Sequence, residues 1–244
     1  MRAILVRIGI DQASKSGGWN GPVDPSSRKF VYVPITNIDG RRHPPGWKRT
    51  YREAVPALND FSEKFGVKEL VIPSHLRWKA MHLDPDFEAL TYGDDGKKRG
   101  SKIKGLSKGD LLVFYAGLRP IGSSRRLIYA IVGLYTVDCV VPAEDVPTRR
   151  RRENAHTRWS VIDSNHIVVR ASSRRSGRLT RCLPIGEWRS KAYRVKPGIL
   201  QAWGGLRVKN GYIQRSARPP EFRHPRTFLR WFEKQNAKFL RRNN

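Results

Sequence analysis

Acidic residues, cysteine and long apolar runs are all scarce in this chain. Its 244 residues carry 21 Asp plus Glu against 48 Lys plus Arg, a formal net charge of +27. A positive excess of this size attracts polyanions, so nucleic acid is the first partner to expect, ahead of an anionic membrane or an acidic protein. The two cysteines, Cys139 and Cys182, lie far apart without a CxxC spacing, which argues against a zinc ribbon or a disulfide framework.

No apolar stretch approaches the length needed to cross a bilayer, and the run at residues 3–6 is too short for a signal peptide. We therefore expect a cytoplasmic protein with no membrane partner. Hydrophobic residues make up 39% of the chain and aromatic residues 10%, which suits a sizeable core and argues against a disordered basic tail. The number of subunits does not follow from the sequence.

Apolar runs bounded by turn residues predict strands at residues 1–10, 29–35, 67–72, 110–117, 126–141 and 166–171. The runs at 110–117 and 126–141 are the strongest signals and are expected to pair as a hairpin. Within the second run, Gly133 indicates a bulge or a close backbone approach. These strands predict that a sheet forms the centre of the fold.

Helix signals are fewer. Thr50 followed by Glu53 fits a capping box for a helix that ends at Gly66. Apolar residues near helical spacing from residue 225 to 240, with Arg and Lys between them, predict a C-terminal amphipathic helix. Asp84 followed by Pro85 predicts the N-cap and first position of a brief helix through residue 90.

The scarce acids are concentrated in one stretch, residues 82–95, which reads HLDPDFEALTYGDD and holds five carboxylates. Clustered carboxylates repel phosphate unless a metal, a proton or a hydrogen-bond donor of a base lies among them. The stretch is therefore the main candidate site. The structural alternative is that acids in a first helical turn only complement the helix dipole.

Two kinds of chemistry fit the candidate catalytic residues Asp84, Asp94, His82, Asp11 and His156. A divalent metal held by carboxylate and imidazole ligands could assist hydrolysis, although no known nuclease motif can be placed and the metal is not identified. Without a metal, an acid beside an aromatic wall could read or attack an extruded base. Candidate members of such a nucleotide pocket are Asn20, Trp19, Tyr92, Tyr115 and Asn154.

Arginine-rich segments are the candidate contacts to a nucleic-acid backbone. The run at residues 149–152 lies between Pro147 and Glu153, where a surface loop or helix start is expected. The full set of expected backbone contacts is Arg119, Arg149, Arg150, Arg151, Arg152, Arg174 and Arg175. Several tryptophans, Trp47 and Trp159 among them, adjoin Lys or Arg, a pairing that can stack a base while the cation meets phosphate. A charge run by itself more commonly marks a solvated surface.

Several segments, taken in order, resemble one family. MRAILVRIGID, GGWNGP, FVYVPI, HLDPDFEALTYGD, GDLLVFYAGLRP and NAH are similar to the nucleotide modification associated domain 3 proteins of phages and prokaryotes, over most of residues 1–185. The family has no assigned activity, so the resemblance implies only a place in DNA base-modification systems. It also adds Thr91 to the pocket residues. The matching positions are Asp11, Gly18, Asn20, His82, Asp84, Asp86, Thr91, Tyr92, Gly93, Asp94, Tyr115, Gly117, Asn154 and His156.

A fainter likeness, over about one hairpin that includes residues 109–115, is to PUA-like readers of modified bases. We therefore predict a single α+β domain over residues 1–244, with a family core at about 1–185 and a basic C-terminal region at about 186–244. The expected architecture is a curved, mostly antiparallel sheet or an open PUA-like barrel with peripheral helices.

The predicted function is recognition or processing of DNA, in particular modified DNA, with RNA as an open alternative partner. The second hypothesis is a DNA-directed enzyme, either a metal-dependent nuclease or a base-modifying or base-excising enzyme, that uses the acids of residues 84–95. In a third, architectural hypothesis the charge coats nucleic acid and the acids only cap a helix.

Overall fold

A computed structural model of the chain describes residues 1–12, 17–37, 40–68, 70–97, 100–122, 126–214 and 218–244. The strands are β1 (Ala3–Arg7), β2 (Pro22–Val23), β3 (Ile35–Thr36), β4 (Met81–His82), β5 (Thr91–Asp94), β6 (Leu111–Pro120), β7 (Ile128–Pro142), β8 (Ile167–Ala171), β9 (Gly177–Pro184), β10 (Gly186–Arg189), β11 (Ala192–Val195) and β12 (Phe239–Leu240). The α-helices are α1 (Val55–Phe65), α2 (Ser101–Lys104), α3 (Pro197–Ala202) and α4 (Pro225–Glu233), and the 3₁₀ helices are η2 (Tyr51–Ala54), η3 (Thr148–Glu153), η4 (Ser173–Arg175) and η5 (Lys209–Gly211).

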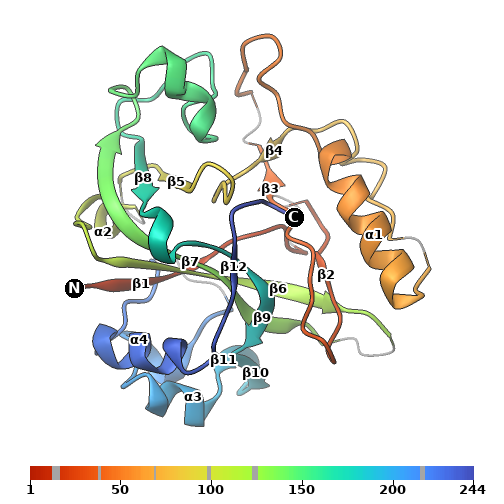
Figure 1. Ribbon diagram of the computed structural model, residues 1–244, viewed down its shortest axis with the longest axis vertical. Coiled ribbons are helices and arrows are strands. Elements are labelled where there is room, and N and C mark those ends of the chain that lie inside the picture. The colour runs from red at the N-terminus through yellow and green to blue at the C-terminus, as the bar shows by residue number, and fades with distance from the viewer. Residues whose placement is uncertain (13–16, 38–39, 69, 98–99, 123–125, 215–217) are drawn as a thin grey trace.

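Strands β6 and β7 form the centre of a mixed sheet, in which eight strands of the described chain take part. β6 pairs antiparallel with β7 and parallel with β1 and β2. β7 is 15 residues long and extends beyond the end of β6 (Figure 1). Its first half also pairs with β9, and its second half pairs with β8, which in turn pairs with β5. The predicted hairpin and the α+β class are confirmed.

Of the two expected architectures, a sheet or an open PUA-like barrel, the described strands form a sheet and not a barrel. The described strands run in the order β1-β6-β7-β8-β5, and the two end strands do not pair with each other. The sheet therefore remains open, and a PUA-like fold is not confirmed. Parallel pairing of β1 and β2 with β6 is the part of the topology that the hairpin signals did not indicate.

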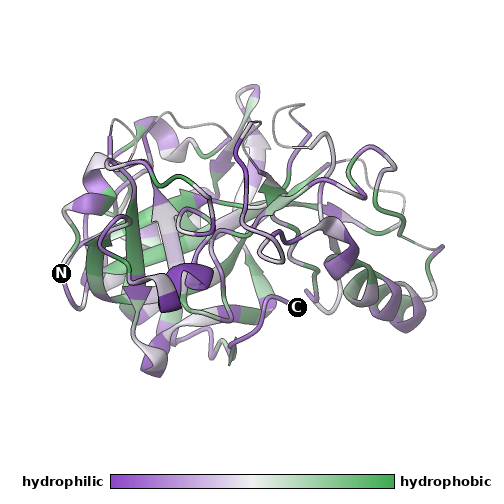
Figure 2. Cartoon of the chain, turned by 90° about the horizontal axis from the view of Figure 1, so that it is seen from above, coloured by the Kyte–Doolittle hydropathy of each residue, from purple (hydrophilic) through white to green (hydrophobic). Residues whose placement is uncertain are grey.

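Both faces of the central sheet are buried, because successive residues of a strand point to opposite faces. In β6, Leu112, Phe114 and Ala116 pack into one core cluster, whereas Val113 and Tyr115 pack into another. Apolar side chains from between residues 195 and 232 complete the second cluster. Helices α3 and α4 therefore cover the face of the sheet to which Val113 and Tyr115 point (Figure 1). In the cartoon of Figure 2, the colour of hydrophobic residues accordingly covers much of the central strands, and that of hydrophilic residues covers parts of the outer helices and loops.

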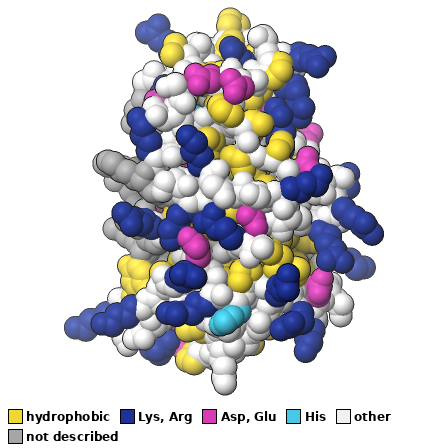
Figure 3. Space-filling view, turned by 90° about the vertical axis from the view of Figure 1, so that its left-hand side faces the viewer, with side chains coloured by type: hydrophobic (Ala, Val, Ile, Leu, Met, Phe, Trp, Pro, Cys, Tyr) yellow, Lys and Arg dark blue, Asp and Glu magenta, His cyan; other side chains and the backbone are white. Residues whose placement is uncertain are grey.

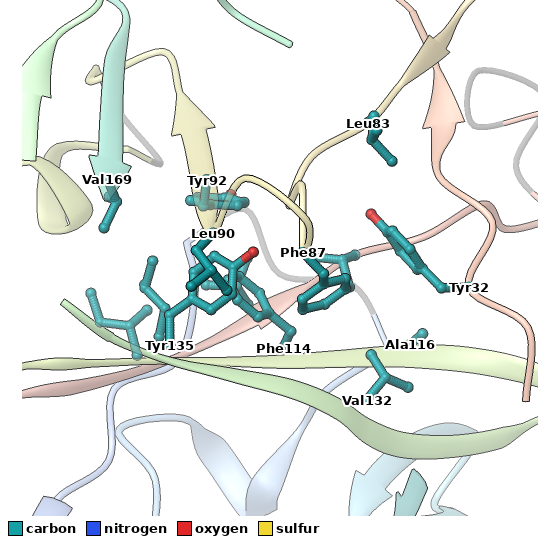
Figure 4. Close-up of a cluster of buried hydrophobic side chains, with 14 of the residues drawn as sticks. Tyr32, Leu83, Phe87, Leu90, Tyr92, Phe114, Ala116, Val132, Tyr135 and Val169 are labelled. Atoms are coloured by element: carbon teal, nitrogen blue, oxygen red, sulfur yellow. The ribbon is translucent and has the colours of Figure 1, made fainter. Parts of the chain in front are cut away.

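The first face is covered by residues 83–92, which carry much of the candidate site. Phe87 is fully buried and meets the rings of Phe114 and Tyr135 edge-on, at centroid distances of 5.8 and 5.7 Å (Figure 4). A Cβ at Gly133 would lie 2.5 Å from the Phe87 ring, and the register of β6 and β7 shifts beside it. The predicted close approach at Gly133 thus makes room for Phe87.

The predicted helix at residues 84–90 is wrong. The Asp86 carboxylate accepts the backbone N–H groups of Glu88 and Ala89, and Asp86 pairs with Thr91 in an isolated bridge. Such local side-chain bonds compete with helix formation. Residues 84–90 therefore form a turn, with Leu90 in the left-handed region at φ 55°.

Other element predictions had mixed outcomes. The helix signals at Thr50 and Gly66 are confirmed: η2 and α1 follow Thr50, and Gly66 ends α1 at φ 58°. The strand expected at 29–35 is reduced to β3 at its end, because the Tyr32 backbone bonds the Asn244 side chain instead of a neighbouring strand. Residues 67–68 and 70–72 form no strand, and residues 239–240 form β12 rather than part of the C-terminal helix.

Within the described residues, no helix is both long and apolar enough to cross a membrane.

Candidate functional site

A cavity of about 460 Å³ lies where β1, β4, β5 and β6 approach one another. It brings together residues that are far apart in sequence, including all five of the predicted catalytic residues. We call it the acidic cavity. Its lining residues are Leu5, Arg7, Ile8, Gly9, Asp11, Ile35, His82, Asp84, Tyr92, Gly93, Asp94, Asp95, Tyr115, His156, Pro219 and Pro220.

Asp84 is held at the wall of the acidic cavity by one of its two carboxylate oxygens. Oδ1 accepts hydrogen bonds from the Gly93 backbone N–H at 2.7 Å and from Asn154 Nδ2 at 3.1 Å. Oδ2 instead lies 3.5 Å from His156 Nε2 and 3.8 Å from His82 Nε2. The carboxylate thus has an anchored oxygen and a second oxygen directed at two imidazoles.

Three buried or partly buried imidazoles form a continuous row beside Asp84. His82 Nε2 lies 3.2 Å from His156 Nε2, and His156 Nδ1 lies 3.0 Å from His166 Nδ1. Trp159 packs against the row, with its ring stacked on that of His82 at a centroid distance of 5.7 Å. His82 Nδ1 is buried with no hydrogen-bond partner among the described residues. The geometry fixes both Nε2 atoms toward the acidic cavity.

Burial sets the protonation states of these groups. It lowers the pKa of His82 to about 3, and the neighbouring His156 imidazole is the next cause. It also lowers the pKa of His156 to about 3, and the next cause there is the neighbouring His166 imidazole. Burial also raises the pKa of Asp84 to about 7, against the opposing effects of His82 and of the bonds from Gly93 and Asn154. Both imidazoles are therefore neutral near neutral pH, and each has one ring nitrogen with an available lone pair.

The absence of a side chain at Gly93 leaves room for the His156 ring. A Cβ on Gly93 would lie 2.3 Å from His156 Cδ2 and 2.6 Å from Asn154 Oδ1. The same residue supplies the N–H that anchors Asp84. A glycine at this point of β5 is thus a condition for bringing Asp84 and His156 together.

The other acids of residues 82–95 divide into two groups. Asp94 and Asp95 line the acidic cavity, and Asp94 Oδ2 accepts the Tyr92 hydroxyl at 3.0 Å. Asp86 points elsewhere: it forms a buried ion pair with Arg158. Glu88 is exposed. The stretch is therefore one structural acid, one exposed acid and three acids at the cavity.

The predicted pocket residues separate in the same way. Tyr92 and Tyr115 line the acidic cavity, and the Tyr115 hydroxyl donates to the Ile213 carbonyl at 2.7 Å. Asn154 and Thr91 stand behind the cavity, where Asn154 Nδ2 donates to both Asp84 Oδ1 and Thr91 Oγ1.

The remaining two pocket residues lie away from the cavity wall. Asn20 donates to the Gly117 carbonyl and Trp19 packs with the apolar cluster around α1. Asp11, a predicted catalytic residue, does line the cavity and forms an ion pair with Arg7 at 2.9 Å.

A second concavity, of about 610 Å³, borders the acidic cavity. We call it the basic groove; among the described residues that line it are Arg41, Arg42, Lys48 and Lys79, and none of them is Asp or Glu. β3 and β4 separate the two concavities: Ile35 and His82 are paired and line the cavity, whereas Thr36, the next residue of β3, and Ala80, which precedes β4, line the groove. The guanidinium of Arg41 also stacks on Trp159, at 4.6 Å from the ring centroid.

The arginines predicted to contact nucleic acid are mostly at the surface. In η3, Arg150 pairs with Glu153, and Arg152 lies over the Trp47 ring at 5.2 Å. Arg149 and Arg174 are exposed, Arg151 and Arg119 are half-buried, and Arg175 pairs with Glu233. Figure 3 shows Lys and Arg spread over one whole face of the molecule, with only scattered acids between them.

Sequence reasoning missed several residues around the site. Trp159 and His166 complete the aromatic wall behind His82 and His156, and Arg7 lines the cavity. Arg41 and Arg42 of the basic groove were also missed. Trp159 stood out only as one of several tryptophans next to a cation, and no local pattern connects it with His82, which is 77 positions away.

The fold and the site define a mixed α+β protein with an imidazole–carboxylate cavity beside a cationic groove. The profile of the family nucleotide modification associated domain 3 matches residues 2–226, so the chain belongs to this family. The resemblance inferred from the sequence is confirmed, and the match extends beyond residue 185. No curated protein and no solved structure matches the chain. Membership associates the protein with nucleotide modification.

Proposed function

We propose that this protein binds nucleic acid along the basic groove and takes one nucleotide, in particular a modified one of DNA, into the acidic cavity. The observation that carries the proposal is the adjacency of the two concavities across β3 and β4. Cations at the groove attract phosphates. Four aspartates at the cavity, Asp11, Asp84, Asp94 and Asp95, repel them. A polynucleotide would therefore place its backbone in the groove and a base in the cavity.

The acidic cavity suits a base for three reasons. Its volume is within the range of about 300–1,000 Å³ that is usual for small-molecule sites. Its carboxylates accept hydrogen bonds from amino or hydroxyl groups, which bases and their modifications present. Tyr92 and Tyr115 add aromatic lining, but their rings are packed in the core clusters, so hydrogen bonds to the carboxylates would offset most of the extrusion cost of a few kcal/mol.

Binding to matched duplexes at several salt concentrations tests the proposal. The duplexes would be unmodified, methylated, hydroxymethylated or glucosylated, and binding would be followed by fluorescence anisotropy. We expect the logarithm of the affinity to fall linearly with that of the salt concentration, by a slope of about −0.9 per phosphate engaged. Arg42→Ala and Lys79→Ala should each make the slope shallower, whereas the exposed Lys108→Ala should not. Equal slopes for all variants would show that the basic groove does not bind the phosphates.

The cavity is tested by Asp94→Asn, which changes charge and hydrogen bonding at nearly constant volume. We expect this variant to lose the preference for one modified duplex while the salt slope remains unchanged. An equal affinity of the unaltered protein for all four duplexes would instead support the architectural hypothesis. If Asp94→Asn still prefers the same modified duplex, Asp94 does not take part in recognising the modified base.

A second function, chemical processing of the bound nucleotide, is favoured by Asp84 and the two neutral imidazoles at the cavity wall. Burial raises the pKa of Asp84 to about 7, so its carboxylate can take up a proton from water or from the nucleotide near neutral pH. Incubation with the preferred duplex followed by mass spectrometry of its nucleosides tests for turnover. Asp84→Asn is expected to abolish any turnover while the bound fraction stays the same. Intact nucleosides after incubation with the unaltered protein would leave recognition as the function.

A further inference from the structure

We propose that His82, His156 and Asp84 form a binding site for one divalent transition-metal ion. Three ligand atoms converge on one point: His82 Nε2, His156 Nε2 and Asp84 Oδ2 lie 3.2, 3.5 and 3.8 Å from one another. Metal–ligand distances of about 2.0–2.1 Å in tetrahedral geometry separate ligands by about 3.3–3.4 Å. The three atoms therefore already stand close to the spacing that an ion between them requires.

The carboxylate is prepared for such a role. Metal-ligating carboxylates are themselves hydrogen-bonded, which fixes the oxygen that reaches the ion. In Asp84 the bonds from Gly93 and Asn154 both go to Oδ1, so Oδ2 keeps its lone pairs for the site. Asn154 is itself held, because its Oδ1 accepts the His156 backbone N–H at 2.9 Å. One asparagine thus positions two of the three ligands.

The imidazoles are prepared in a related way. A ligating histidine usually uses its second ring nitrogen for a hydrogen bond that fixes the ring and the tautomer. His156 Nδ1 bonds His166 Nδ1 at 3.0 Å, which leaves His156 Nε2 for the ion. His82 has no such partner at Nδ1, and its ring is instead held by stacking on Trp159.

The donor set and its surroundings specify the class of ion. Two nitrogens and one oxygen favour a first-row transition metal such as Zn²⁺, Fe²⁺, Mn²⁺ or Co²⁺ over Mg²⁺ and Ca²⁺, which prefer oxygen ligands. Three protein ligands leave at least one coordination position open, as in catalytic metal sites. All three residues line the acidic cavity, so water or a ligand in that cavity would take the open position.

A dication would also compensate the negative charge of the aspartates at the acidic cavity. Within the described part of the chain, the ion pairs of the buried Asp84 are to the two neutral imidazoles alone, and the neighbouring Arg158 is engaged with Asp86. Asp94 and Asp95 line the same cavity. An ion at Oδ2 would neutralise Asp84 directly and offset the negative charge of the other two.

Metal titration of the full-length protein, without nucleic acid, tests the site apart from the proposed function. After removal of metals by a chelator, Zn²⁺ binding would be measured by calorimetry and Co²⁺ binding by its visible absorption bands. We expect one equivalent per chain. His82→Ala, His156→Ala and Asp84→Asn should each weaken binding by more than 100-fold. His166→Ala should weaken it by about 10–100-fold, the usual effect of losing a ligand's hydrogen-bond partner.

The exposed His224→Ala serves as the matched control and should bind as the unaltered protein does. If an alanine variant fails to fold, histidine NMR resonances of the unaltered protein decide the matter. Zn²⁺ should then shift the signals of His82 and His156 and leave that of His224 in place. Absence of stoichiometric binding, or binding unchanged by Asp84→Asn and by both alanine variants, would overturn the proposal.

Discussion

Asp84 and Asp86 are two residues apart and both buried, yet their carboxylates have different partners. Asp86 faces Arg158 and the backbone N–H groups of its own turn. Asp84 faces two neutral imidazoles and no arginine. At the scale of single residues, the surroundings place one acid in the hydrogen bonds of the turn and the other at the wall of the cavity.

Breaking the Asp86–Arg158 pair is expected to destabilise the protein strongly. The two side chains are only 3% and 5% exposed, and removing one partner leaves a buried charge uncompensated, at a cost of about 3–5 kcal/mol. Arg158→Ala should lower the free energy of unfolding, measured by urea denaturation, by this amount. Arg175→Ala breaks the exposed pair with Glu233 and should change it by less than about 1 kcal/mol. Similar losses for both variants would contradict the assignment.

Gly93→Ala is expected to disrupt the site more than the fold. The added Cβ would collide with His156 and Asn154 at 2.3 and 2.6 Å, so His156 must move away from Asp84. We expect the NMR signals of the His156 ring to shift and Zn²⁺ binding to weaken at least 10-fold. In the control Gly198→Ala, the new methyl group meets no atom within 4 Å. An unshifted His156 signal in Gly93→Ala would show that the site has more room than the structure indicates.

At the scale of elements, the hairpin of β6 and β7 positions the candidate site through one packing contact, that of Phe87 with Gly133. Residues 84–92 lie on the hairpin by way of Phe87, whose ring fills the space left by Gly133 (Figure 4). The strand ladder beside this contact shifts register between Phe114 and Tyr115. The turn that holds Asp84 and Asp86 is therefore positioned by the sheet beneath it.

Gly133→Ala tests this contact. The Cβ would lie 2.5 Å from the Phe87 ring, and overpacking of a core costs about 1–3 kcal/mol. Phe87→Leu should be destabilising alone, yet combined with Gly133→Ala it should cost less than the sum of the two, because the smaller side chain accepts the new methyl group. Chemical denaturation of both single variants and the double variant measures the coupling. Strictly additive losses would show that the two residues are not in contact.

The signals for β6, β7 and the helix at 55–65 were strong because they are local. Alternating apolar residues, the Glu53 carboxylate that accepts the Thr50 N–H, and Gly66 at a positive φ all act within a few positions of the elements they specify. The helix at 84–90 was wrong and the strand at 29–35 was confirmed only at its end, because both segments bond to distant residues. Tyr32 bonds Asn244, and Asp86 bonds Arg158 and Asn243.

At the scale of the whole molecule, residues at the end of the chain support the candidate site. Asn243 Nδ2 donates to Asp86 Oδ1 at 3.1 Å, and its Oδ1 accepts the Phe87 N–H at 2.8 Å. Asn244 makes a similar pair of bonds with the backbone of Tyr32, whose ring meets that of Phe87. Two segments on the same face of the sheet are thus fastened by the last residues.

Asn243→Ala is expected to loosen residues 84–92. The variant loses two hydrogen bonds worth about 0.5–1.5 kcal/mol each, so the free energy of unfolding should fall by about 1–3 kcal/mol. Amide exchange at Phe87 should accelerate, since its N–H loses its acceptor. Asn59→Ala, on the exposed face of α1, is the matched control and should affect neither quantity. Unchanged protection of the Phe87 amide would contradict the role given to Asn243.

The sequence alone determined the charge of the protein, its family, the central hairpin and the residue types of the site, because composition, periodicity and ordered motifs are properties of the chain itself. The tertiary structure decided which acids line the cavity. Asp84 meets His82 and His156 only after β4, β5 and the segment following η3 converge, and the basic groove forms where residues 36–37, 40–48 and 79–80 lie together. These contacts join positions far apart in the chain, and no local preference of the chain encodes them.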